Sequence, residues 1–196
     1  VVFSEESNRA QTNLLYIERL IKSLLWVHGG WKITVGGPEY IGEYIRKAYT
    51  AGGIREFDAK FMSRVYEKPF TVEITEYDHV SESKEDTNPV GRNLDGCRIG
   101  FDAGGSDRKV SAVIDGNAVY SEEVIWHPKV TSDPDYHFNE ILTAMKTAAS
   151  HMPRVDAIGV SSAGVYVDNR VMVASLFLKV PEDQFDAKVK DIYLNC

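Results

Sequence analysis

The sequence predicts an α/β fold whose second half carries a mixed β-sheet with elements in the order strand, strand, strand, helix, strand. Three consecutive segments are predicted to be strands, at 98–102, 110–114 and 117–124, and the third has alternating character. An apolar stripe at helical spacing then runs from Phe138 to Met152. The run 155–160 that comes next is nearly all apolar, and we expect it to be a buried central strand.

The ends of that helix are also marked in the sequence. Asp133 suits the cap position and Pro134 the first turn, while Pro153 closes the stripe. A turn-rich loop at 161–169 and a further apolar strand, Val171–Val180, are expected after it, which would give a mixed sheet of five strands. An edge strand as apolar as Val171–Val180 would need a cover, so we expect either the N-terminal part to fold over it or the chain to form a homo-oligomer.

The first 80 residues predict a helical N-terminal extension. Leu14–Leu25 is an amphipathic helix that Gly29 and Gly30 stop. The further elements expected are a strand at 31–35, helices at 40–48 and 57–66, and a strand at 70–74. Residues 78–96 lack periodicity and are rich in charged and turn-forming residues, which indicates a linker. The predicted division is therefore an α/β extension with its linker at 1–96 and a second domain at 97–196.

Composition narrows the classes of partner. Hydrophobic residues make up 43% of the chain, enough for a sizeable core, and the net charge is −7. An acidic chain with a pI near 5.3 argues against binding to nucleic acid or to an anionic membrane. The sequence shows neither an apolar run of membrane-spanning length nor a signal peptide, and Cys97 and Cys196 have no partner spacing. We expect a cytoplasmic protein with reduced thiols.

The string Asp102-Ala103-Gly104-Gly105-Ser106 lies between the first two strands of the second domain. Phosphate groups must approach backbone N–H groups closely, and glycine allows this because it has no Cβ. Gly104, Gly105 and the Ser106 hydroxyl are therefore predicted to bind phosphate. The alternative is a plain hairpin turn, for which Gly-Gly is common.

Two charged residues flank the glycines. A carboxylate beside a polyphosphate would be repelled unless a cation lies between them, so Asp102 is predicted to be the metal-binding residue. Lys109 is predicted to add a positive charge for the phosphates.

Ile99–Ser106, together with Lys109 and Asp115-Gly116, resembles the first phosphate motif of the superfamily of hexokinases, actins and heat-shock chaperone ATPases. Within it, the string is most similar to the ROK family of repressors and sugar kinases. The resemblance covers residues 98–180, with Ser106 in place of the usual Thr. It implies a ribonuclease-H-like lobe of the actin-like ATPase type, ATP and Mg²⁺ as cofactors, and a sugar as the second substrate.

Residues 155–168 are similar to a ROK segment that lines the sugar cleft. Gly159, Gly164, Val167 and Asp168 match that segment, whereas 161–163 depart from its Gly and Pro pattern. The resemblance makes Ser161, Ser162, Gly164 and Asp168 the candidates for the substrate cleft. The alternative is an ordinary loop between strands, in which Ser, Gly and Asp are common.

Two features of the family are missing from the sequence. No Asn-Asp pair, which would supply the general base, occurs after Asp168, and the five histidines have no neighbouring cysteines for zinc. We therefore expect an ATP:sugar phosphotransferase lobe that is inactive by itself. Two other interpretations stay open: an ATPase that activates another enzyme, and a non-catalytic sensor or interaction module, which Asp107 beside the turn favours.

Overall fold

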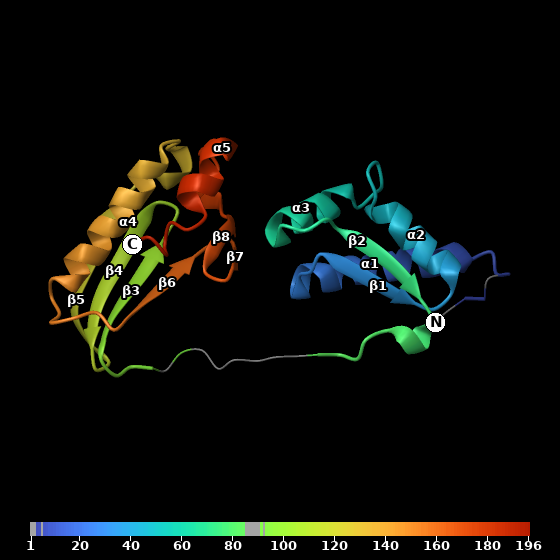
Figure 1. Cartoon of the computed structure of the whole chain (residues 1–196), viewed down its shortest axis with the longest axis horizontal. Helices are drawn as coiled ribbons and strands as arrows, with labels where there is room; N and C mark the ends of the chain where they lie inside the picture. Colours follow the sequence, from blue (N-terminus) through green and yellow to red (C-terminus); the bar gives the residue numbers. More distant parts are fainter. Residues whose placement is uncertain (1–2, 5, 85–90, 92) are drawn as a thin grey trace. The chain divides into compact units, whose positions relative to one another are not determined.

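The computed structural model describes residues 3–4, 6–84, 91 and 93–196. The chain divides into two compact units, residues 1–87 and 88–196, each of which is described by itself (Figure 1). The linker expected at 78–96 lies partly outside the described residues. Of its described part, 77–79 form a single 3₁₀ turn and 80–84 have no regular structure.

The N-terminal unit contains the helices and the two strands that the sequence predicts. Its elements are α1 (Ala10–His28), β1 (Lys32–Gly36), α2 (Glu39–Tyr49), α3 (Glu56–Tyr66) and β2 (Thr71–Thr75). β1 pairs with β2 in parallel, and the buried side chains come mainly from α2 and α3. The apolar stripe of α1 is only partly used, because Leu25 is buried whereas Leu15, Leu20 and Leu24 are exposed.

A charged cluster lies inside this unit. Glu18 of α1 and Asp58 of α3 are both buried, and the Arg55 guanidinium forms ion pairs with both carboxylates. The indole N–H of Trp26 also donates a hydrogen bond to Asp58. Burial, together with the Asp58 charge, raises the pKa of Tyr49 to about 12. The carboxylates and the guanidinium satisfy one another, which is what burial of charge requires.

The C-terminal unit has the predicted order of strands and helix. Its elements are β3 (Cys97–Ala103), β4 (Asp107–Ile114), β5 (Asn117–Ile125), α4 (Pro134–Ala149) and β6 (Ala157–Ser162). They form a mixed sheet in the order β5-β4-β3-β6, in which β6 is parallel to β3 and the other pairs are antiparallel. The Asp133 carboxylate caps α4 by accepting the Asp135 N–H, as predicted.

One face of this sheet is packed and the other is not. Ile99, Phe101, Val110 and Ala112 alternate along β3 and β4 and are buried with Ile141 and other residues of α4. The residues between them in sequence point to the opposite face, because side chains alternate along a strand. Figure 1 shows α4 along the sheet. The face away from α4 is therefore available for a site.

The expectation that 155–160 forms a central buried strand is wrong. In the described part of the chain, β6 is at the edge of a sheet of four strands, not five, and it pairs only with β3. Its residues 157–161 are exposed. An all-apolar sequence indicates a strand, but here it does not indicate which neighbours the strand has.

The expected strand Val171–Val180 is also wrong. β8 (Arg170–Val173) is short and pairs only with β7 (Val165–Val167), in a hairpin whose turn residues Asp168 and Asn169 both have positive φ. Positive φ at both positions is typical of a type I′ turn, which reverses the chain at once. The apolar residues after β8, such as Leu176 and Phe177, are buried with Val189 and Ile192 of the C-terminal helical turns. Their burial, and not a strand, explains the apolar run.

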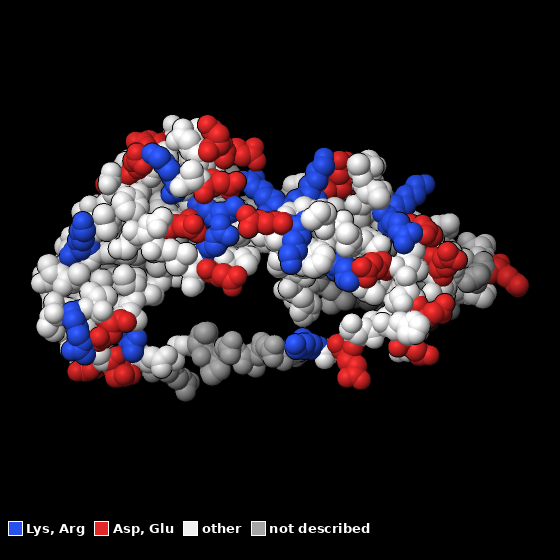
Figure 2. Space-filling view, in the orientation of Figure 1, with Lys and Arg blue, Asp and Glu red and all other residues white. Residues whose placement is uncertain are grey.

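No helix in the described part of the chain is long and apolar enough to cross a membrane. Positive and negative side chains are interspersed over the face of each unit that Figure 2 shows.

Candidate functional site

Residues 104–106 form the turn between β3 and β4, at the end of the sheet where the parallel strands β3 and β6 both finish. Any Cβ on Gly104 would overlap the carbonyl oxygen of Asp107, so only glycine fits there. The buried Trp126 fixes the turn through two hydrogen bonds. Its indole N–H donates to the Gly104 carbonyl at 2.8 Å, and its backbone N–H donates to the Ser106 carbonyl at 3.1 Å.

The turn presents unused hydrogen-bond donors. Within the described residues, the backbone N–H groups of Gly105 and Ser106 donate to no acceptor. The two glycines are half-buried and Ser106 is exposed. Successive free N–H groups in a turn make a concave site for an anion, which is the arrangement that phosphate requires. The position predicted for phosphate binding therefore has the donors that this function needs.

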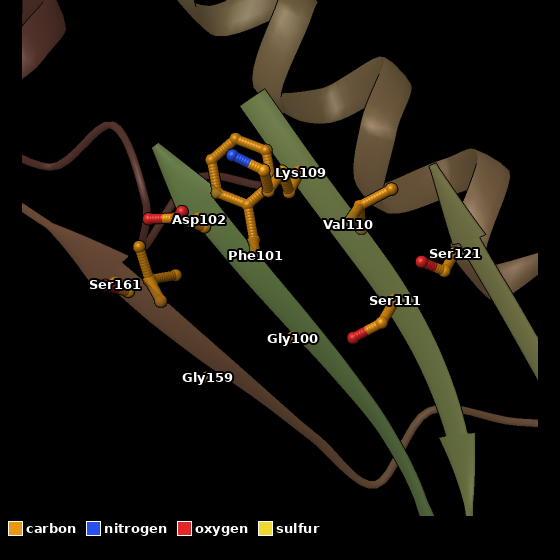
Figure 3. A pocket seen from close by; sticks show the side chains of 10 residues that line it. Gly100, Phe101, Asp102, Lys109, Val110, Ser111, Ser121, Gly159 and Ser161 are labelled. Carbon is orange, nitrogen blue, oxygen red and sulfur yellow. The ribbon is translucent and has the colours of Figure 1, made fainter. Parts of the chain in front are cut away.

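A cavity of about 570 Å³ lies on the uncovered face of the sheet next to this turn (Figure 3). Its floor is made of small residues, among them Gly100, Gly159 and Ser111. Asp102 and Lys109 lie directly opposite each other in the β3–β4 register, and Ser161 is beside Asp102 in the β3–β6 register. The fold thus brings together at one end of the cavity Asp102, Lys109 and Ser161, which come from three different strands.

The Asp102 carboxylate is available for a ligand. Among the described residues it makes neither a hydrogen bond nor an ion pair, and it lines the cavity. The same part of the chain contains no group of three or more His, Cys, Asp or Glu residues that could hold a metal ion. Mg²⁺ is commonly held by one or two carboxylates together with substrate phosphates. The donor set therefore fits a cation that arrives with a nucleotide.

Lys109 and Ser106 are both engaged by Asp107. The Lys109 Nζ lies 2.7 Å from one Asp107 carboxylate oxygen, and the Ser106 hydroxyl donates to the other at 3.1 Å. These hydrogen bonds, first that from Lys109, lower the pKa of Asp107, and the same contact raises the pKa of Lys109. Two of the groups assigned to phosphate thus already have an anion beside them.

A second lysine lies against the turn, and the sequence gives no sign of it. Lys129 belongs to a short 3₁₀ turn, Pro128–Val130, and its ammonium occupies the place where a Cβ of Gly105 would be. The fully buried His137 holds this segment, because its two ring nitrogens contact the carbonyl oxygens of Pro128 and Asp133 at 3.0 and 2.9 Å. Nothing in the local pattern indicates that the segment folds back over residues 104–106.

The four candidates for the substrate cleft do not lie together. Ser161 lines the cavity beside Asp102, whereas Ser162, the next residue of β6, contacts the Tyr193 hydroxyl at 3.3 Å. Asp168 is one of the two turn residues of the β7–β8 hairpin. Gly164 packs against the backbone of 173–174, where a Cβ would overlap the Val173 carbonyl. Of the four, Ser161 alone faces the cavity.

No protein-family model matches the chain, and no curated protein matches it. The geometry of the turn and the cavity is therefore the basis on which a function can be assigned.

Proposed function

We propose that residues 97–196 form the phosphate-binding lobe of an ATP-dependent sugar kinase of the ROK or hexokinase-like type. The observation that carries the proposal is that two free N–H groups, those of Gly105 and Ser106, lie near the unpaired Asp102 carboxylate at one end of an open cavity. The sheet order β5-β4-β3-β6, with α4 on one face, supports a ribonuclease-H-like lobe of the actin-like ATPase type. A kinase of this type uses cytoplasmic ATP, so the proposal includes a cytoplasmic location.

Each residue then has a distinct task. The N–H groups of Gly105 and Ser106 bind the phosphate oxygens, and Lys129 adds positive charge beside Gly105. Asp102 would hold the nucleotide's Mg²⁺, and the ion would neutralise part of the phosphate charge. Ser161 lies beside Asp102, where it can orient a sugar hydroxyl. Positioning of this kind supplies most of the catalysis in phosphoryl transfer.

The test is a titration of the ¹⁵N-labelled chain with Mg·ADP, read by NMR. We expect weak binding, with a dissociation constant on the order of 1 mM, because one lobe makes only part of the contacts. The amide signals of Gly104, Gly105 and Ser106 should shift the most. If those three signals stay unchanged at saturating Mg·ADP, the proposal fails.

Asp102→Asn should weaken the binding of Mg·ADP about tenfold while leaving the binding of metal-free ADP unchanged or slightly tighter. The variant keeps the shape of the side chain but removes the charge that attracts the cation. The matched control is Asp115→Asn in the β4–β5 turn, where asparagine suits the positive φ and no effect on affinity is expected. Equal loss of affinity with and without Mg²⁺ would contradict the role given to Asp102.

A non-catalytic sensor or interaction module is the second candidate function, and the contact of Asp107 with Lys109 favours it. In that case the resting site keeps its affinity for phosphate low.

Asp107→Asn should raise the affinity for Mg·ADP roughly three- to tenfold. The change removes a negative charge beside the phosphates and leaves Lys109 with only its looser ion pair to Glu123, at 3.7 Å, so that the ammonium can turn to them. The same titration measures it, with Glu122→Gln on the other face of the sheet as the control. An unchanged or lower affinity would show that Lys109 does not serve the phosphate site.

A further inference from the structure

β6 presents a free backbone edge. Among the residues that the structure describes, the strand pairs with β3 on one side only, and its residues 157–161 are exposed. Ile158 and Val160 are 43% and 39% exposed although both are β-branched apolar residues. Figure 2 shows a white, uncharged surface at the place that the middle of β6 occupies in Figure 1. An open edge with these properties is a template for another strand.

The two edges of the sheet differ in how well they are protected. β5, the opposite edge strand, carries the adjacent carboxylates Glu122 and Glu123, and its pairing with β4 contains a register shift. Like charges and bulges of this kind discourage pairing between edges. β6 has the sequence Ala-Ile-Gly-Val-Ser-Ser, without charge or proline, and pairs with β3 without a register shift. Of the two edge strands of this sheet, β6 is therefore the one that can pair with an added strand.

We propose that β6 pairs with the β6 of a second copy of this chain, antiparallel and centred on Gly159. The strand is complementary to itself in this register. Ile158 of each copy lies opposite Val160 of the other, and β-branched pairs across antiparallel strands are favourable. Gly159 meets its own copy at the two-fold axis, where the lack of a side chain lets the backbones approach. The arrangement is closed, because both copies use the same surface.

A hollow beside the edge adds to this surface. A cavity of about 410 Å³ is lined by Ile158 and Val160 of β6, by Tyr166 of β7, and by Tyr193 and Leu194 near the C-terminus. An added strand would carry its own Ile158 and Val160 on the same face of the extended sheet, next to this lining. Pairing would therefore bury apolar side chains as well as join backbone groups. This surface does not include Asp102 or the turn at 104–106, although Gly159, Val160 and Ser161 of β6 also line the cavity of the proposed site.

Pairing of six residues buries less than the roughly 1,200–2,000 Å² of a standard stable interface. We therefore expect a dissociation constant on the order of 10–100 µM. Sedimentation equilibrium over about 5 to about 500 µM covers this range, since the dimer fraction obeys mass action. A chain that stays monomeric over the whole range overturns the proposal.

Ile158→Lys should raise the dimer dissociation constant at least about tenfold, because an edge lysine opposes pairing. The matched control is Ile125→Lys, the same change at an exposed position of the other edge strand, which should leave the constant unchanged. Circular dichroism checks that both variants are folded, and Val160→Lys serves if Ile158→Lys is not. Dimers that persist in a folded Ile158→Lys or Val160→Lys variant overturn the proposal.

Gly159→Cys tests the register. A Cβ at this position would come no nearer to other atoms than 4.0 Å, from the Ile99 carbonyl oxygen, so the variant should fold. Its thiols should be joined within the dimer by a short bis-maleimide, whereas those of Ile125→Cys should not. Background from the native thiols is low, because Cys97 is buried and burial raises the pKa of Cys196 to about 11. A dimer that Gly159→Cys does not cross-link has another interface, and the proposal is then wrong.

Discussion

Gly104→Ala should lower the affinity of the chain for Mg·ADP by at least about tenfold, although it adds a single methyl group. The added Cβ would overlap the Asp107 carbonyl oxygen. This contact joins a Cβ to a backbone atom, so it cannot be relieved by rotating a side chain. The turn must therefore move. Movement breaks the hydrogen bond from Trp126 to the Gly104 carbonyl and turns the N–H groups of Gly105 and Ser106 away from the phosphates. Losing that bond and straining the turn should cost about 1–3 kcal/mol of stability.

Gly105→Ala is the matched control for this experiment. Its Cβ would meet the ammonium end of Lys129, a flexible side chain that can swing aside without backbone movement. We expect stability within about 0.5 kcal/mol of the parent chain and a loss of affinity of only a few-fold, because Lys129 is displaced. NMR titration and urea unfolding of both variants give the comparison. Equal affinities for Gly104→Ala and the parent chain would show that the turn does not bind phosphate.

Those parts of the site were predictable that depend only on the alternation of side chains along a strand. Asp102 comes after an apolar run, and the strand–turn–strand pattern places it opposite Lys109. The contact between Lys109 and Asp107 also agrees with the rule that side chains two apart share a face. Lys109 could contact the carboxylate of Asp107 or that of Asp102. Which of the two it contacts depends on side-chain rotamers, and these cannot be predicted from the sequence pattern. Lys129 was not predictable, because a buried histidine further along the chain holds its segment.

The errors in the fold have a common physical cause. An apolar run in the sequence indicates that its residues are buried. It does not indicate which other element of the fold buries them. The run at 171–180 is buried under later helical turns, and the run at 155–160 is left at an edge. In the first case the signal that could have prevented the error is Asp168-Asn169, a pair that tolerates positive φ and so suits a tight hairpin. The helices of the N-terminal unit were predictable because their apolar spacing is long and regular.

Glu18 is the residue of that unit for which the sequence pattern is most misleading. A charged residue inside an amphipathic helix suggests a solvated position, yet Glu18 is only 1% exposed. It is buried because Arg55 reaches it from the loop before α3, 37 residues along the chain. Only the packing of α1 against that loop reveals the pair. The same burial makes each partner costly to remove alone, because the other would keep its charge without water or a counter-ion.

Arg55→Met should lower the stability of the N-terminal unit by about 3–5 kcal/mol, because Glu18 would be left as an uncompensated buried charge and Asp58 would lose its second partner. The double variant Glu18→Met/Arg55→Met should recover the part of this loss that comes from Glu18, since apolar residues of similar volume often replace a buried ion pair at little cost, whereas Asp58 keeps only its hydrogen bond from Trp26. Hydrogen exchange read by mass spectrometry measures both, with peptides of 97–196 as an internal reference in the same molecule. The single change should speed exchange in α1, α2 and α3 by a factor on the order of 10²–10⁴, and the double change by less. If the two variants exchange equally fast, the stabilisation comes from packing by the arginine stem and not from neutralising the buried carboxylate.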